Sequence, residues 1–210
     1  MNELTAIAVV PQDISPKRRL VARAAEELFL ALGYGAVSMD QVARRAGVSK
    51  ATLYAYFPSK DALFANLMHE RGMDGPLCDD LFPDEVTDLR AALETISERL
   101  LRFMLQERTL AIYRMALSEA VRFPELGQAF YQNGPQHMSE RFIRWLEMLR
   151  GAGLVEAEDL TVATQQFMAL MRSGVFLRRS LAVPPEASEQ EIKATAKAAA
   201  RAWLKAYERK

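Results

Sequence analysis

Apolar residues recur at steps of three and four along almost the whole chain, and this spacing constrains the fold more than any other feature. In one segment Leu89, Leu93, Ile96, Leu100 and Phe103 fall on a single narrow stripe of a helix. Nowhere do apolar and polar residues alternate as they do in a half-buried strand, and no internal repeat is found. The sequence therefore predicts an all-α protein.

Capping residues and helix breakers divide this pattern into about nine helices. The expected ranges are about 15–33, 38–47, 49–58, 59–71, 84–107, 109–122, 124–150, 159–181 and 186–208, with a loop at 72–83. The seventh helix is expected to be interrupted at Asn133-Gly134-Pro135. The first three helices form a compact unit at residues 15–60, which leaves residues 61–210 for a second domain.

Composition excludes several classes of protein. Of 210 residues, half are apolar and 26% are charged, which is typical of a chain that folds around a core. The longest stretch without Asp, Glu, Lys or Arg, Leu126–Ser139, has 14 residues, too few to span a bilayer. The N-terminus has no basic region, and the single cysteine, Cys78, allows no internal disulfide. We therefore expect a soluble, cytoplasmic protein with no membrane partner.

Charge is distributed unevenly, although 27 basic and 27 acidic side chains give a net charge of zero. Residues 15–60 carry eight basic and three acidic side chains, a net charge of +5, so the rest of the chain carries −5. The acidic excess is concentrated in residues 70–98, which carry −7. Such asymmetry favours a face that binds a polyanion, but an ordinary solvated helix surface would also produce it.

Residues 38–57 have the layout of a helix-turn-helix. Ala43 is small enough for a second helix to cross the first, Gly47 supplies the positive φ of the turn, and Leu53 holds the helices together. The side chains that point away from this packed face are Lys50, Thr52 and Tyr56. The second helix therefore presents a cation, a hydroxyl and a phenol, and it is slim enough to enter the major groove of DNA.

Phosphate sites are expected at helix N-termini of the same unit. Ser38 and Ser49 precede the two helices, where backbone N–H groups and a hydroxyl can bind a phosphate, and Lys60 lies at the next N-terminus. The alternative is a three-helix unit that only packs.

The segment GYGAVSMDQVARRAGVSKATLYAYFPSKDALF resembles the DNA-binding domain of the TetR/AcrR family of bacterial transcriptional regulators. The match covers about residues 15–64. It implies that Ser38, Tyr54, Tyr56 and Lys60 hold phosphates, while Ser49, Lys50 and Thr52 approach base edges. Ala51 and Ala55 stand where the family often has Gly and a larger residue, so the operator sequence does not follow from the resemblance.

The rest of the chain resembles the AefR-like subgroup through IYRMALSEAVRFPELGQAFYQNGP and the long helix after it. The resemblance implies that residues 61–210 bind a small effector and that the last two helices form a homodimer. The residues expected at that interface are Phe167, Leu170, Gly174, Leu177, Ala196, Ala199, Trp203 and Tyr207. The alternative is that these residues pack only within the subunit.

An effector pocket would be lined by adaptable apolar side chains. The candidates are Phe103, Met104, Tyr113, Met115, Phe130, Tyr131, Phe142, Trp145, Met168 and Met171. Any one of them also fits an ordinary core. Arg114 and Glu119 are either polar groups of the pocket or side chains on different faces of one helix.

Neither catalysis nor a cofactor or metal site is expected. No nucleotide-binding, hydrolase or metalloprotease motif occurs, and His69 and His137 are far apart in sequence. The carboxylates of Glu156, Glu158 and Asp159 gather where a helix begins, which favours its dipole without a metal.

The expected function is that of a homodimeric repressor that binds a palindromic operator and is released by a small, apolar effector. In this mechanism a ligand between the fifth and eighth helices moves the fourth and separates the two recognition helices. The alternatives are an activator with the same DNA-binding mode, or a helical ligand-binding protein or enzyme whose DNA-binding domain is vestigial.

Overall fold

The computed structural model describes residues 15–68 and 81–209, and the regular secondary structure of this part of the chain is helical, apart from one isolated β-bridge between Val155 and Glu208. The expected all-α fold is confirmed. None of the described helices is both long and apolar enough to cross a bilayer. The expected end of the fourth helix and most of the 72–83 loop lie outside the described residues, as do His69 and Cys78.

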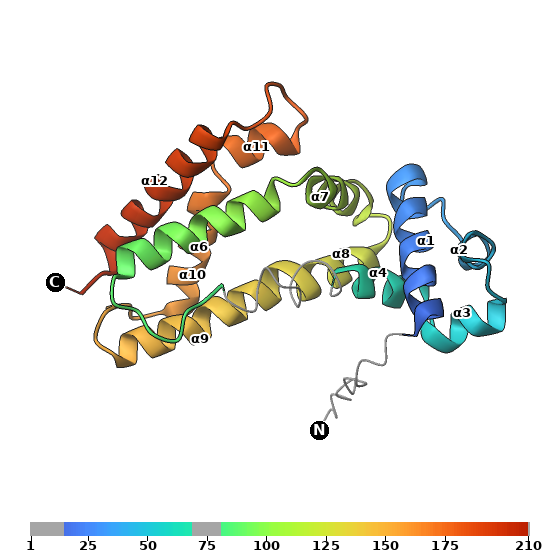
Figure 1. Cartoon of the computed structure of the whole chain (residues 1–210), viewed down its shortest axis with the longest axis horizontal. Helices are drawn as coiled ribbons and strands as arrows, with labels where there is room; N and C mark the ends of the chain where they lie inside the picture. Colours follow the sequence, from blue (N-terminus) through green and yellow to red (C-terminus); the bar gives the residue numbers. More distant parts are fainter. Residues whose placement is uncertain (1–14, 69–80, 210) are drawn as a thin grey trace.

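Four helices make up the N-terminal part of the molecule. They are α1 (Pro16–Leu32), α2 (Met39–Ala46), α3 (Lys50–Tyr56) and α4 (Lys60–Met68). In Figure 1 α1, α2 and α3 form a head at one end, and α4 leads from it into the larger body. The head thus protrudes from one end of an elongated molecule.

Local signals in the sequence produce the expected helix-turn-helix. The hydroxyl of Ser38 accepts a hydrogen bond from the backbone N–H of Gln41, whose side chain in turn accepts from the Ser38 N–H. Gly47 ends α2 with φ of +67°, a left-handed conformation that costs glycine little, and Ser49 caps α3 by accepting from the N–H of Thr52. These caps fix the angle at which α3 leaves the turn.

The body contains the remaining helices. They are α6 (Leu89–Met104), α7 (Glu107–Glu119), α8 (Pro124–Tyr131), α9 (His137–Gly151), α10 (Leu160–Met171), α11 (Val175–Ser180) and α12 (Glu189–Tyr207). A π-helical turn, η2 (Gln132–Gln136), joins α8 to α9, and the three form one long rod through the molecule (Figure 1). The body is therefore built around a helix that runs from the head side to the far end.

Three expected helix boundaries in the body are wrong. The helix expected from residue 84 begins at Leu89, because the carboxylate of Asp88 caps it by accepting from the N–H of Ala91. The interruption expected at 133–135 is a continuous π-helical turn, whose wider hydrogen-bonding pattern accommodates Pro135. The helix expected at 159–181 breaks at Gly174, where φ is +48°, so Gly174 separates two helices instead of lying on one seam.

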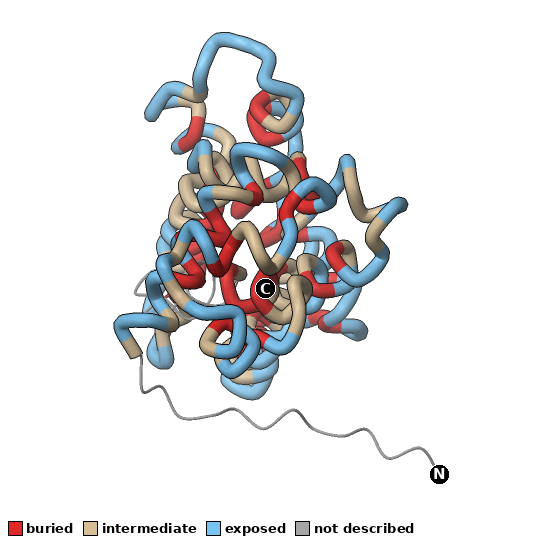
Figure 2. Tube along the Cα trace, turned by 90° about the vertical axis from the view of Figure 1, so that its right-hand side faces the viewer, coloured by how far each residue is buried: buried red, intermediate tan, exposed pale blue. Residues whose placement is uncertain are grey.

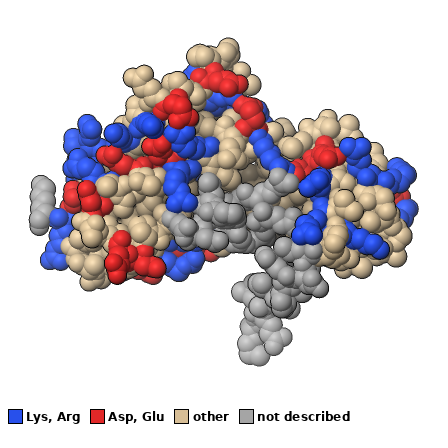
Figure 3. Space-filling model, viewed as in Figure 1, with Lys and Arg blue, Asp and Glu red and all other residues tan. Residues whose placement is uncertain are grey.

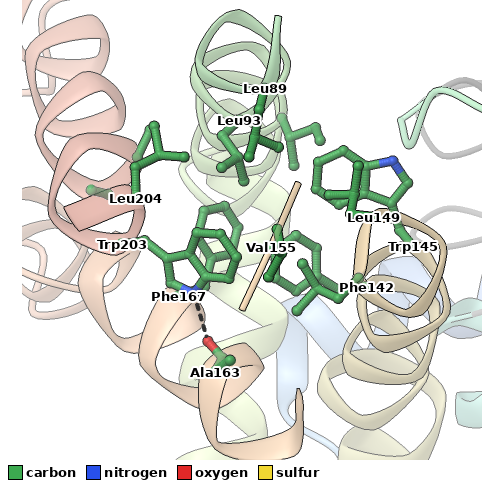
Figure 4. Close-up of a cluster of buried hydrophobic side chains, with 14 of the residues drawn as sticks. Leu89, Leu93, Phe142, Trp145, Leu149, Val155, Ala163, Phe167, Trp203 and Leu204 are labelled. Atoms are coloured by element: carbon green, nitrogen blue, oxygen red, sulfur yellow. Dashed lines mark hydrogen bonds between the residues drawn. The ribbon is translucent and has the colours of Figure 1, made fainter. Parts of the chain in front are cut away.

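One of two large apolar clusters fills the body. We call it the body core: the buried apolar side chains of α6, α9, α10 and α12, with Leu81, Val155 and Ala157. At its centre the rings of Phe142 and Phe167 stack with their centroids 4.5 Å apart, and the Trp203 indole packs edge-on to both (Figure 4). The Trp203 N–H donates to the carbonyl of Ala163 at 2.8 Å, so this core buries no unpaired indole.

The second cluster joins the head to the body. We call it the head core: the buried apolar side chains of α1, α2, α3 and α4, with Tyr34, Val37, Phe57 and three residues from α7 and α8, namely Met115, Leu126 and Ala129. In Figure 2 the buried parts of the chain occupy the interior, whereas the outer turns are exposed. Because α4, α7 and α8 help to bury the head, the expected division at residues 60 and 61 does not coincide with a break in packing.

Candidate nucleic-acid interface and ligand cavity

The outer face of α3 is the candidate DNA-reading surface. Leu53 is fully buried beneath it, which fixes the rotation of the short helix. On the opposite side Lys50, Ala51 and Ala55 are exposed, and the Tyr54 side chain is 49% exposed. The sequence thus supplies a helix anchored on one face and open to a partner on the other.

Several of the predicted DNA-contacting residues already have partners within the head. The Lys50 ammonium lies 2.5 Å from the carboxylate of Asp40, and the hydroxyls of Ser49 and Thr52 are 2.9 Å apart. The hydroxyl of Tyr56 is 2.9 Å from that of Ser15, just before α1. These contacts orient the polar side chains in the absence of DNA.

Lys60, which is predicted to hold a phosphate, points inward in this structure. Its ammonium donates to the carbonyls of Tyr34 and Val37 at 2.8 and 3.0 Å, and it lies over the Tyr34 ring at 4.2 Å. Burial lowers the pKa of Lys60, and the carboxylates of Glu119 and Glu125 oppose that effect. In this structure Lys60 therefore holds the loop between α1 and α2.

Basic side chains are spread over the exposed surface of the head (Figure 3). Lys17, Arg19, Arg23 and Arg44 are exposed, whereas the exposed Arg45 is paired with Glu27 at 2.6 Å. The positive excess found in the sequence is thus on the surface, where it can attract a polyanion.

Glu119, at the end of α7, clamps the loop that follows α1. Its two carboxylate oxygens accept from the backbone N–H groups of Tyr34 and Gly35 at 2.8 and 2.6 Å. A Cβ atom at Gly35 would lie 2.6 Å from the Phe123 ring, so only glycine allows this close approach. The sequence alone left the role of Glu119 open.

The role of Arg114 was left open as well. Its guanidinium donates to the carbonyls of Arg179 and Ser180 at the end of α11.

A cavity of about 570 Å³ lies between the head core and the body core. Part of its wall is formed by Leu67 and Met68 of α4, and another part includes Met138 and Met171. Of the predicted effector-binding residues, Phe103, Met104, Tyr113, Phe130, Tyr131, Met168 and Met171 line it. The volume suits a drug-sized ligand.

Three predicted effector-binding residues do not line this cavity. Phe142 and Trp145 lie in the body core, and Met115 lies in the head core. The indole N–H of Trp145 donates to the carbonyl of Pro83 at 2.9 Å, which fixes it within the core. Helical spacing shows that such residues are buried, but it does not show which buried space they face.

The polar part of the cavity wall is cationic. Among the described lining residues are two guanidinium groups, Arg108 and Arg172, and no carboxylate. Arg108, near the start of α7, forms an ion pair with Glu26 of α1, a residue only 4% exposed. Burial lowers the pKa of Arg108. The ion pair of Arg108 with Glu26 thus connects the wall of the cavity to α1 of the head.

Half of the residues predicted at a dimer interface lie inside the subunit. Phe167, Ala196, Ala199 and Trp203 are at most 3% exposed and pack between the helices of the body. On the surface or partly buried are Leu170, Gly174, Leu177 and Tyr207. The apolar seam recognised in α12 therefore packs within the subunit.

Within residues 15–68 and 81–209, no group of three or more His, Cys, Asp or Glu side chains is placed to hold a metal ion. Asp159 caps α10 by accepting from the N–H groups of Thr161 and Val162 at 2.7 and 3.1 Å, as its position before the helix predicts.

Two family models match the chain. Residues 21–67 match the model described as bacterial regulatory proteins of the TetR family, and residues 91–209 match the C-terminal domain of AefR-like transcriptional repressors. The second model alone covers more than half of the chain.

Known proteins agree with these matches. A solved structure described as the flavonoid-responsive regulator FrrA is 38% identical, with a TM-score of 0.72 over 91% of this chain and 97% of that one. The transcriptional regulator RutR of Escherichia coli is 37% identical over 57 residues, which is 27% of either protein. The transcriptional activator FasR of Mycolicibacterium smegmatis is 36% identical over 89 residues, 42% of this chain and 35% of FasR. The chain thus spans well under half the length of these two curated relatives.

Proposed function

This chain belongs to the TetR family of transcriptional regulators, and we propose that it is a homodimeric repressor that binds a palindromic operator and is released by a small effector. The observation that carries the proposal is the exposed face of α3, which the caps at Ser38 and Ser49 orient away from the head core. A seven-residue helix presented in this way fits the major groove of DNA.

DNA binding follows from the chemistry of this face. Lys50, Thr52 and Tyr54 supply donors for base edges and phosphates, and the exposed arginines and lysines of the head attract the duplex. Lys50 must exchange its contact with Asp40 for one with DNA. Because that ion pair is exposed, the exchange costs little.

Dimerisation is needed because one short helix reads few bases, whereas two related by a two-fold axis read half-sites about 34 Å apart. The surface that remains available on the last long helices supports it. On α12 the exposed alanines Ala194, Ala198, Ala202 and Ala206 recur every fourth residue, a spacing that allows close helix approach. Nearby in sequence, Leu177 and Leu181 are 58% and 67% exposed.

Effector binding is assigned to the cavity between the two cores. Because Leu67 and Met68 of α4 form part of its wall, a ligand there would contact the helix that leads to the head. The related FrrA is described as flavonoid-responsive, which is consistent with a mostly apolar pocket for a small ligand. To weaken operator binding by about 2.7 kcal/mol, the effector must bind the released state about a hundredfold more tightly.

Repression is favoured by the match of residues 91–209 to a domain of transcriptional repressors. The second candidate function is activation, because the related FasR is described as an activator. Both functions use the same DNA-binding face. The position of the operator relative to the promoter distinguishes them, since a repressor site overlaps the promoter and an activator site lies upstream of it.

The test begins with selection of bound sequences from a random DNA pool. A palindromic site with half-sites about one helical turn apart is expected for the dimer. The Tyr54→Ala variant should lose about tenfold or more in affinity for that site with little loss of thermal stability, because Tyr54 is 49% exposed. Val121→Ala is the control, since Val121 is 95% exposed after α7 and its loss should not change DNA binding.

Recovery of no specific site, or unchanged binding by Tyr54→Ala, would contradict a DNA-reading role for α3. In that case the remaining alternative is a helical ligand-binding protein or enzyme whose DNA-binding domain is vestigial.

A further inference from the structure

We propose that the cavity binds amphipathic anions, and that Arg108 couples their charge to the head by exchanging its ion pair with Glu26 for one with the ligand. The inference rests on the proposed function and adds to it a ligand class and a route of release. It is carried by the ion pair between Arg108, a residue of the cavity wall, and Glu26, a buried residue of α1.

The charge of the cavity wall favours an anion. The described lining residues are mostly apolar, but Arg108 and Arg172 place two positive charges among them with no carboxylate in the same wall. A ligand with an apolar body and one acidic group would match both features. A cationic ligand would face two like charges.

Arg108 has hydrogen-bonding capacity left for such a ligand. A guanidinium carries five N–H donors in a planar fork, and the Nε of Arg108 is buried without a hydrogen-bond partner in the described chain. The side chain as a whole remains about one-third exposed, so it is not sealed inside the protein. An oxyanion can therefore approach the fork and compete with the Glu26 carboxylate for the same donors.

The competition affects the head because Glu26 is almost completely buried. It lies on α1 beside Ala25 and Ala22, both residues of the head core. A carboxylate in such surroundings needs its charge balanced, so removal of Arg108 to a ligand weakens the contact between α1 and α7. The anion thus favours a state in which α1 has shifted relative to α7, and a neutral ligand of the same shape does not.

A pair of fluorescent probes that differ only in charge provides the test. These are 1-anilinonaphthalene-8-sulfonate, which is anionic, and N-phenyl-1-naphthylamine, which has the same rings without the sulfonate. Binding of each probe to the full-length protein is measured by fluorescence titration without DNA. The wild type is expected to bind the anionic probe about tenfold more tightly, the gain expected from one charge-assisted contact in a confined site.

Two substitutions should shift this preference in opposite directions. Arg108→Gln removes the cation, so the two probes should bind about equally. Glu26→Gln keeps the size of the side chain but removes the competing carboxylate, so the anionic probe should bind severalfold more tightly than to wild type. Arg90→Gln, an exposed substitution on α6, is the matched control and should leave both affinities unchanged. A purely structural role for the pair would not produce opposite shifts.

Operator binding supplies a separate readout. The anionic probe at saturation should weaken binding to the selected operator, and the neutral probe should weaken it less. If both probes bind wild type equally, if neither binds, or if Arg108→Gln and Glu26→Gln shift the preference in the same direction, the inference is overturned. Those results leave operator binding intact as evidence for the proposed function, whereas absence of any specific operator contradicts that function without changing the probe affinities.

Discussion

The two apolar cores of this molecule differ in the interactions at their edges. The body core is completed by apolar contacts and by aromatic rings such as Phe142, Phe167 and Trp203, whose indole N–H is paired internally. The head core is apolar as well, but three charged contacts lie at its border: Arg108 to Glu26, Glu119 to the loop after α1, and Lys60 to the carbonyls of that loop. The first arrangement gives permanent structure, and the second gives contacts that a ligand or a charge can displace.

The difference matters because apolar burial is non-directional, whereas charge-assisted hydrogen bonds depend on geometry and on competitors. A core held by the first kind of interaction tolerates small displacements with little change in energy. A junction held by the second kind has two distinct states, made or broken. The cavity lies between the two cores, so a ligand there is placed to act on the junction without loosening the body.

The largest effect on stability is expected when a side chain at the centre of the body core is removed. Trp203→Ala should lower the free energy of unfolding by about 3–5 kcal/mol, because the indole is 1% exposed and packs against two aromatic rings. Urea unfolding followed by circular dichroism measures it. Val121→Ala, at a side chain 95% exposed, is the control and should change stability by less than about 0.5 kcal/mol. A loss for Trp203→Ala as small as the control's would mean that the body is held elsewhere.

A smaller effect is expected at the junction. Glu119→Gln leaves one acceptor but turns an amide N–H₂ toward the N–H of Tyr34 or Gly35, so one backbone donor loses its partner, at a cost of about 1–3 kcal/mol. Hydrogen exchange at these two amides should accelerate, while exchange in α9 and α12 should not change. Glu147→Gln, an exposed substitution on α9, is the control. Uniformly faster exchange over the whole chain would show that the junction and the body open together.

The smallest effect on stability is expected for an exposed ion pair, which tests whether buried and exposed charges differ in their contribution. Arg45 and Glu27 lie on the head with side chains 60% and 47% exposed, so Arg45→Gln should lower stability by about 0.5 kcal/mol or less. A double-mutant cycle with Glu27→Gln, followed by thermal unfolding in low and high salt, isolates the pair. A coupling energy as large as the Glu119 effect would contradict the view that charged ties matter only where they are shielded from water.

The head was predictable because its signals are local. Ser38, Gly47 and Ser49 each act on residues within a few positions, so caps and turn follow directly from the sequence. The body was predicted only in outline. Gly174 fits both a close helix contact and a helix break, and only the positive φ in the folded chain decides between them. The seam of α12 was recognised as apolar, but spacing does not reveal whether it faces the same subunit or another.

The candidate site divides in the same way. The face of α3 follows from a short motif, and most of the predicted effector-binding residues do line the cavity, because aromatic and thioether side chains recur on neighbouring helices. The pair of Arg108 with Glu26 and the clamp of Glu119 were not anticipated. Each joins residues more than 80 positions apart, and no local pattern marks a charged residue that is to be buried by a distant element.

Between the two cores, the π-helical turn at Gln132–Gln136 accommodates an extra residue in a rod that contributes α8 to one core and α9 to the other. One residue corresponds to about 100° of helical rotation. Because the wider turn already absorbs this rotation, deleting a single residue here would restore a regular α-helix and leave the apolar face of α9 toward its partners. The π-helical turn should therefore tolerate the loss of one residue better than the interior of α9, where the same deletion would rotate every following side chain by about 100°.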